Sequence, residues 1–155
     1  DRVALSVIQW SGEDKQEVSI DWRQMTSPLD VAQMASNVRR LERAFVLSDT
    51  APAEAITFSI QHFAGAPDCN RRVIDVSGDG TPNAGSEVRR MRRVAQSAGI
   101  TINGLAIEGL GVAITNFYRQ SLVTRDGFVI TARGHRDYAR AIREKILREI
   151  SRVLG

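Results

Sequence analysis

Two apolar strands joined by an amphipathic helix restrict the fold of this chain more than any other feature. Val73 to Ser77 forms the first strand and Ile100 to Ile107 the second. Between them, Ser86 to Ala98 repeats apolar or small side chains at helical spacing, with arginines on the flanks. A connection of this length, containing a helix, joins strands that run parallel, because antiparallel neighbours need only a tight turn. The sequence therefore predicts a parallel sheet.

The same alternation extends over the rest of the chain. Val3 to Trp10 and Glu17 to Trp22 are predicted to pair antiparallel at a sheet edge, since the second strand alternates polar and apolar residues. Helices are predicted from Pro28, from Thr50 and near residues 113–121, followed by a strand over 127–132 and a closing helix. We therefore expect a doubly wound α/β fold: a mainly parallel sheet with helices on both faces and one antiparallel edge strand.

Two helices are each predicted to bury one apolar face. The first helix is expected to bury Val31, Ala35, Val38, Leu41 and Phe45, and the closing helix Ala139, Ile142, Ile146, Ile150 and Val153. Outside the closing helix, Arg140, Glu144 and Arg148 are spaced for ion pairs one turn apart.

Length and composition exclude several classes of protein. A chain of 155 residues, 43% hydrophobic and 25% charged, is expected to form a single domain over residues 1–155. No apolar run reaches the roughly 20 residues that span a bilayer, so no membrane span is expected.

The net charge is +3, and almost all of the positive charges are arginines, so nucleic acid must be considered as a partner. Because the arginines lie opposite apolar helix faces, without interleaved aromatic residues, we expect no specific nucleic-acid binding.

The loop Ser77-Gly78-Asp79-Gly80 carries the main candidate chemistry. It ends an apolar strand, so Asp79 is expected at the carboxyl edge of the sheet, where open α/β sheets bind ligands. Thr50 stands just ahead of a helix that could begin at the same edge. One hydroxyl and one carboxylate, with water, suit a hard cation such as Mg²⁺. The residues alone leave a second interpretation open, in which Thr50 is an N-cap and Asp79 a turn residue bonded to its own loop.

Several segments, in order, carry a resemblance to a known family: Trp10-Ser11-Gly12, Asp21-Trp22, Thr50, Arg72 to Gly80, and Gly99 to Ile107. Together they make the chain similar to a bacterial branch of the von Willebrand factor type A (VWA) superfamily, known mainly as a domain of unknown function. The resemblance covers essentially the whole chain. It implies a doubly wound α/β domain with a metal-ion-dependent adhesion site. The ion, Mg²⁺ or another divalent cation, completes its shell with a carboxylate from a partner protein.

By position, Thr50 and Asp79 match two of the three loops of that site. Ser77, Gly78 and Gly80 would shape the Asp79 loop, and Asn83 would anchor its far end. The first strand of the family, with its Asp-x-Ser-x-Ser loop, has no counterpart in the chain. We therefore expect the domain to be N-terminally incomplete, with an upstream Asp-x-Ser-x-Ser. The remaining pair would bind a hard cation weakly, so that the site would be empty in this chain.

The resemblance implies a protein-binding module and not an enzyme. The principal alternative is a Mg²⁺-dependent phosphatase, because Ser77 to Thr81 resembles the Asp-x-Asp-Gly-Thr loop of haloacid-dehalogenase-type enzymes. Ser77 stands where that nucleophile would be and has no carboxylate to form an acyl phosphate. The other alternative is non-specific binding of nucleic acid through the arginine-rich helices. Relatives of this kind are often exported, which favours the periplasm, but the sequence fixes neither compartment nor oligomeric state.

Three further polar residues are expected to be structural. Asp75 lies inside an apolar strand, so its carboxylate needs a partner such as Arg72 or a loop N–H. His62 is expected on a helix surface and His135 near a helix start, with no triad or metal cluster around either.

Overall fold

The computed structural model describes residues 2–46, 49–83 and 87–154, with the backbone alone for residues 149–154. The chain divides into two compact units. The first unit comprises residues 1–70 and 82–86, and the second comprises residues 71–81 and 87–155.

An antiparallel hairpin and two helices make up the first unit. Strands β1 (Val3–Trp10) and β2 (Gln16–Met25) pair from Trp10 opposite Gln16 to Val3 opposite Met25, which confirms the predicted antiparallel pairing. The two strands form a two-stranded sheet of their own. Helix α1 spans Pro28–Arg39 and helix α2 spans Pro52–His62, followed by the 3₁₀ turn η1 (Phe63–Gly65).

The predicted inward face of α1 is wrong. Val31 and Val38 are 55% and 43% exposed, and Met34 is the buried residue of this helix. Leu41 and Phe45 lie beyond its end. The helix begins at the N-cap Ser27, as expected: the Ser27 hydroxyl accepts from the Asp30 N–H, and the Asp30 carboxylate accepts from the Ser27 N–H. Because this capping box fixes the start of the helix locally, α1 forms without burying a full apolar stripe.

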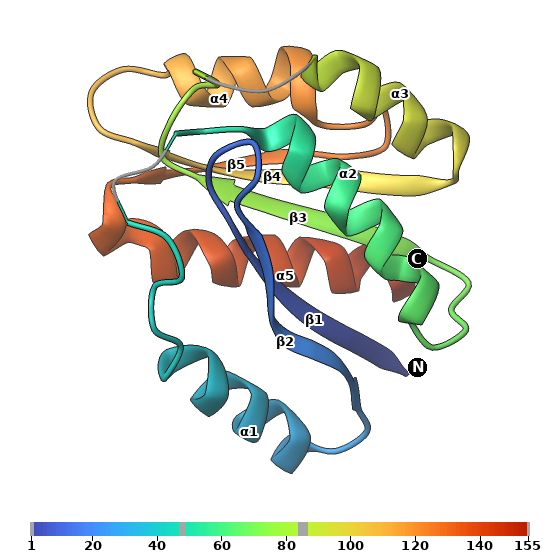
Figure 1. The fold of residues 1–155 in the computed structure, drawn as a ribbon. Coiled ribbons are helices and arrows are strands. Elements are labelled where there is room, and N and C mark those ends of the chain that lie inside the picture. The colour runs from blue at the N-terminus through green and yellow to red at the C-terminus, as the bar shows by residue number, and fades with distance from the viewer. Residues whose placement is uncertain (1, 47–48, 84–86, 155) are drawn as a thin grey trace. The chain divides into compact units, whose positions relative to one another are not determined.

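The second unit is a three-layer α/β structure. Its strands β3 (Arg72–Gly78), β4 (Ile100–Glu108) and β5 (Val129–Arg133) run parallel in the order β3-β4-β5. Helices α3 (Val88–Ser97) and α4 (Ala113–Phe117), with the π-helical turn η2 (Tyr118–Leu122), cover one face, and α5 (Tyr138–Leu154) covers the other (Figure 1). The expected parallel sheet with helices on both faces is therefore present. Among the described strands β4 lies in the middle, and it is buried along its whole length.

The chemistry of the loops explains where these elements begin and end. Gly99 has a φ of 70° at the end of α3, where a glycine C-cap is expected. The predicted helix over 86–98 starts at Val88 in the structure, and Ser86 lies outside the described residues.

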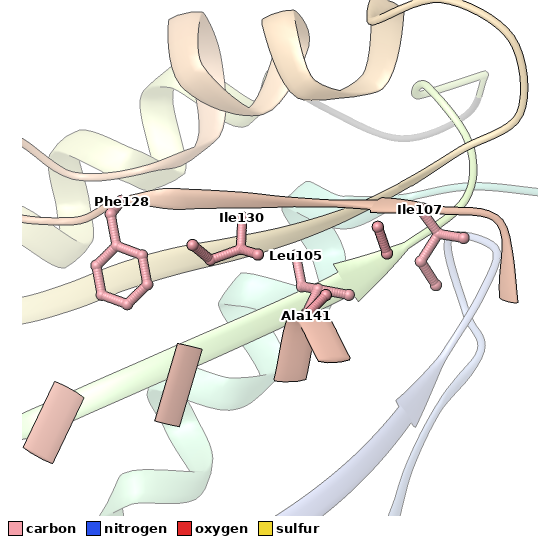
Figure 2. Close-up of a cluster of buried hydrophobic side chains, with 6 residues drawn as sticks. Leu105, Ile107, Phe128, Ile130 and Ala141 are labelled. Atoms are coloured by element: carbon pink, nitrogen blue, oxygen red, sulfur yellow. The ribbon is translucent and has the colours of Figure 1, made fainter. Parts of the chain in front are cut away.

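A buried apolar cluster joins β4 and β5 to α5 (Figure 2). It consists of Leu105, Ile107, Phe128, Ile130, Ala132 and Ala141. The predicted inward stripe of α5 is only partly right, because Ile142 packs on the cluster while Ala139 and Ile146 are exposed. The side chains of Ile150 and Val153 lie outside the described residues. Besides Ala141, the buried position of this helix is Lys145.

An ion pair accounts for the buried lysine. The Lys145 ammonium lies 2.5 Å from Asp75 Oδ2, with 6% of the lysine side chain exposed and 37% of the aspartate side chain. The Asn103 amide, on β4, donates to Asp75 Oδ1 at 3.4 Å and its oxygen accepts from the Phe128 N–H at 3.1 Å. Asp75 therefore finds the structural partners it was expected to need, and Lys145 is one that the local pattern did not suggest.

Candidate functional site

The carboxyl edge of the second unit gathers the candidate site residues. Its three strands run parallel, so their ends at Gly78, Glu108 and Arg133 lie on one edge of the sheet. Asp79 directly follows β3 and His135 follows β5. Ser77 and Gly78 end β3 opposite Leu105 and Ala106 of the middle strand. The strand order therefore brings a carboxylate and an imidazole from distant parts of the sequence to one edge.

Asp79 contacts that imidazole. Asp79 Oδ2 lies 3.4 Å from His135 Nε2, and the two side chains are 68% and 72% exposed. The polar contact described for Asp79 is thus with the β5–α5 turn rather than with its own loop. Sequence reasoning missed His135 as a neighbour of Asp79, because only the strand order brings the two together.

Tyr118 places a buried hydroxyl within electrostatic range of Asp79. The residue is 1% exposed, and its ring packs so closely on Gly104 that a methyl group there would lie 2.6 Å from Cδ2. Its hydroxyl has no hydrogen-bond partner among the described residues. Burial, and next the charge of Asp79, raise the pKa of this hydroxyl far above its ordinary value. A buried hydroxyl without a hydrogen-bond partner is uncommon in native structures.

Glu108 is fully engaged at the same edge. It is 2% exposed, and its carboxylate accepts from the N–H groups of Ile114 at 3.0 Å and Thr115 at 3.2 Å. Its carbonyl accepts from the Gly134 N–H at 2.8 Å. Glu108 therefore anchors the start of α4 and the β5–α5 turn, which leaves Asp79 as the accessible carboxylate beside His135.

Thr50 and Asn83 meet in the first unit. The Thr50 N–H donates to Asn83 Oδ1 at 2.7 Å, and the Asn83 N–H donates to the Thr50 carbonyl at 3.2 Å. The N-cap of α2 is Ala51, so the interpretation of Thr50 as a plain N-cap is wrong. Thr50 thus belongs to the first unit and Asp79 to the second. Gly80, half-buried in the loop after β3, also belongs to the second unit.

His62 has a set of neighbours that resembles a nucleophilic triad only in composition. Its Nε2 lies 2.8 Å from Ser6 Oγ and 3.6 Å from Asp21 Oδ1, so both contacts fall on one nitrogen. A triad needs the carboxylate on the other nitrogen. The Ser6 hydroxyl also donates to the Ile20 carbonyl at 2.8 Å. The imidazole is stacked on Trp22 and only 16% exposed, so the prediction of a surface histidine is wrong and a structural role is supported.

Two arginines of α3 make internal contacts. Arg89 Nε donates to the Ser121 hydroxyl at 3.2 Å, and Arg92 donates to the Gln120 carbonyl at 2.8 Å. These hydrogen bonds connect α3 to η2, so both arginines have a structural role that does not involve nucleic acid.

Larger ligand sets are absent from the part of the chain that the structure describes. Residues 2–46, 49–83 and 87–154 contain no group of three or more His, Cys, Asp or Glu side chains placed to hold a metal ion. Within the same residues, every helix is too short or too polar to cross a membrane.

Solved structures share the fold of this chain. Proximal thread matrix protein 1 from the mussel byssus superposes with a TM-score of 0.61 at 13% identity, over 81% of this chain and 32% of the mussel protein. The SpRpn10 VWA domain superposes with a TM-score of 0.58 at 11% identity, over 84% of this chain and 65% of that one. The chain thus spans less than two thirds of either structure. At these identities the likeness shows a VWA-like fold and nothing more.

Sequence comparison gives the family. No curated protein matches the chain. The family model described as "Protein of unknown function (DUF1194)" matches residues 1–154, almost the entire length. The chain belongs to this family, and its fold is VWA-like.

Proposed function

We propose that this chain is a binding module that recognises a partner protein through the carboxyl edge of the β3-β4-β5 sheet. Asp79 would hold a divalent cation there, and a carboxylate of the partner would complete the shell of the ion. The ion supplies a positive charge that accepts oxygen ligands from both proteins.

The exposed carboxylate of Asp79 carries the proposal. It stands at the edge where open α/β sheets bind ligands, and 68% of its side chain is accessible. Its contact with His135 is an exposed pair, and such pairs contribute about 0–1 kcal/mol to stability. The contact between Asp79 and His135 therefore adds little to the stability of the fold.

Binding is favoured over catalysis for two reasons. Ser77 carries no carboxylate that could form an acyl phosphate. VWA-like folds also commonly mediate protein interactions, and this chain has that fold. Turnover of an aryl phosphate with Mg²⁺ that disappears in Asp79→Asn would support the phosphatase alternative instead.

Cation binding provides the first test. Mg²⁺ and Mn²⁺ are titrated calorimetrically into the wild type and Asp79→Asn. Asp68→Asn is the matched control, because it removes one charge from an exposed loop of the first unit. We expect binding in the wild type and the control, and a loss in Asp79→Asn. Unchanged binding in Asp79→Asn would contradict the proposal.

Partner binding provides the second test. The immobilised wild type, Asp79→Asn and Asp68→Asn proteins are incubated with a cell extract, with and without EDTA. A protein retained by the wild type and the control, and released by EDTA and by Asp79→Asn, is the expected result. Retention that EDTA leaves intact would argue against a cation at the interface.

A further inference from the structure

The distance between Asp79 and His135 suits two ligands of one ion better than a hydrogen bond. Asp79 Oδ2 and His135 Nε2 are 3.4 Å apart, beyond the usual 2.7–3.2 Å of an N–H···O bond. Two ligand atoms about 2.0–2.2 Å from a tetrahedral ion are about 3.4 Å apart. The separation therefore matches that of two ligand atoms on one tetrahedral cation.

The turn that carries His135 is braced. Gly134 has a φ of 76°, which favours glycine, and its N–H donates to the Glu108 carbonyl at 2.8 Å. The Asp137 carboxylate accepts from the Arg133 N–H at 2.8 Å and pairs with Arg140 at 2.6 Å. Asp137 is therefore occupied, whereas the His135 side chain is 72% exposed. A ligand held on a fixed turn loses little freedom when it binds.

We propose that Asp79 Oδ2 and His135 Nε2 together bind a transition-metal cation of the Zn²⁺, Co²⁺ or Ni²⁺ class, in preference to Mg²⁺. The proposal rests on the proposed function and names the ion that the site takes. Imidazole nitrogen suits these metals, whereas Mg²⁺ favours oxygen ligands in an octahedral shell. The exposure of both side chains leaves the remaining positions open to water and to a partner's carboxylate.

The experiment uses untagged protein carrying Cys69→Ser, because a half-buried free thiol is itself a zinc ligand. Zn²⁺ affinity is measured by competition with a chelating dye, and Co²⁺ binding by its visible absorption. Mg²⁺ is titrated in parallel. The variants are His135→Ala, Asp79→Asn and the control Asp68→Asn. ¹⁵N spectra of the imidazoles add a direct readout, with His62, the other histidine of the chain, as internal reference.

We expect His135→Ala and Asp79→Asn each to weaken Zn²⁺ binding by more than about tenfold, since even outer-layer partners of a metal site are worth 10–100-fold. Asp68→Asn should leave it unchanged. Zn²⁺ should shift the His135 Nε2 resonance and leave that of His62 in place.

Two outcomes separate the failure of this inference from that of the proposed function. If His135→Ala binds Zn²⁺ and Co²⁺ like the wild type while Asp79→Asn loses Mg²⁺, the transition-metal pair is refuted and the proposed function stands. If Asp79→Asn changes the binding of no cation, both are refuted.

Discussion

Asp75→Asn removes the charge that faces the buried Lys145 and preserves the shape of the side chain. Breaking a buried ion pair by removing one partner costs about 3–5 kcal/mol, because the other charge stays buried. The Asp75 side chain is 37% exposed, so water reaches one end of the pair. We therefore expect a cost below that range, about 2–3 kcal/mol of unfolding free energy.

Lys145→Met tests the same pair from the other side. The remaining Asp75 carboxylate is accessible enough to be hydrated, and methionine fills the volume of the lysine stem. We expect a change within about 1 kcal/mol, since apolar replacements of buried charges are often neutral. The double variant should recover most of the loss caused by Asp75→Asn.

Urea unfolding followed by far-UV circular dichroism measures these differences. Glu144→Gln is the matched control, because it breaks an exposed pair with Arg140 on the same helix, where both side chains are 54% exposed. Its effect should stay below about 0.5 kcal/mol. The reasoning is refuted if Lys145→Met costs as much as Asp75→Asn, or if Asp75→Asn is as mild as the control.

Two further predictions concern the second unit. Gly127→Ala would place a methyl group 2.1 Å from the Ile102 carbonyl oxygen, so it should lower the unfolding free energy by about 1–3 kcal/mol or more, as overpacking does. Gly109→Ala is the control, because its methyl group would meet nothing within 4 Å. Thermal unfolding of both variants checks this prediction. The hydrogen bond from Arg140 holds the pKa of Asp137 well below its ordinary value, so its contribution is present above about pH 4 and is lost as the pH falls toward the depressed pKa. Melting temperatures of Asp137→Asn should therefore fall less steeply below pH 4 than those of the wild type, and parallel curves would contradict this.

Local patterns in the sequence were sufficient for most elements of the fold. Runs in which apolar residues predominate made Val73 to Ser77 and Ile100 to Ile107 recognisable as strands. The inner face of α5 was not predictable in this way. A lysine in an apolar stripe ordinarily faces water, and Lys145 is buried only because Asp75 lies opposite it.

The candidate site was also predictable only in part. Asp79 could be placed at the carboxyl edge because a strand ends just before it. His135 could not be placed beside Asp79, since their proximity depends on the strand order β3-β4-β5, which no local pattern encodes. For Tyr118 the one available signal was Gly104, a glycine inside a strand, which often marks a close approach by another group.

The two kinds of strand pairing have a consequence for folding kinetics. The hairpin joins near neighbours along the chain, such as Trp10 and Gln16, and hairpins of this kind form within about 1–10 μs. The parallel sheet pairs Arg72 with Ile100, so a long loop must close before the first contact forms. Both tryptophans, Trp10 and Trp22, belong to the hairpin. In a stopped-flow refolding experiment, tryptophan fluorescence should therefore change before the slower gain of helical circular dichroism from α3 and α5.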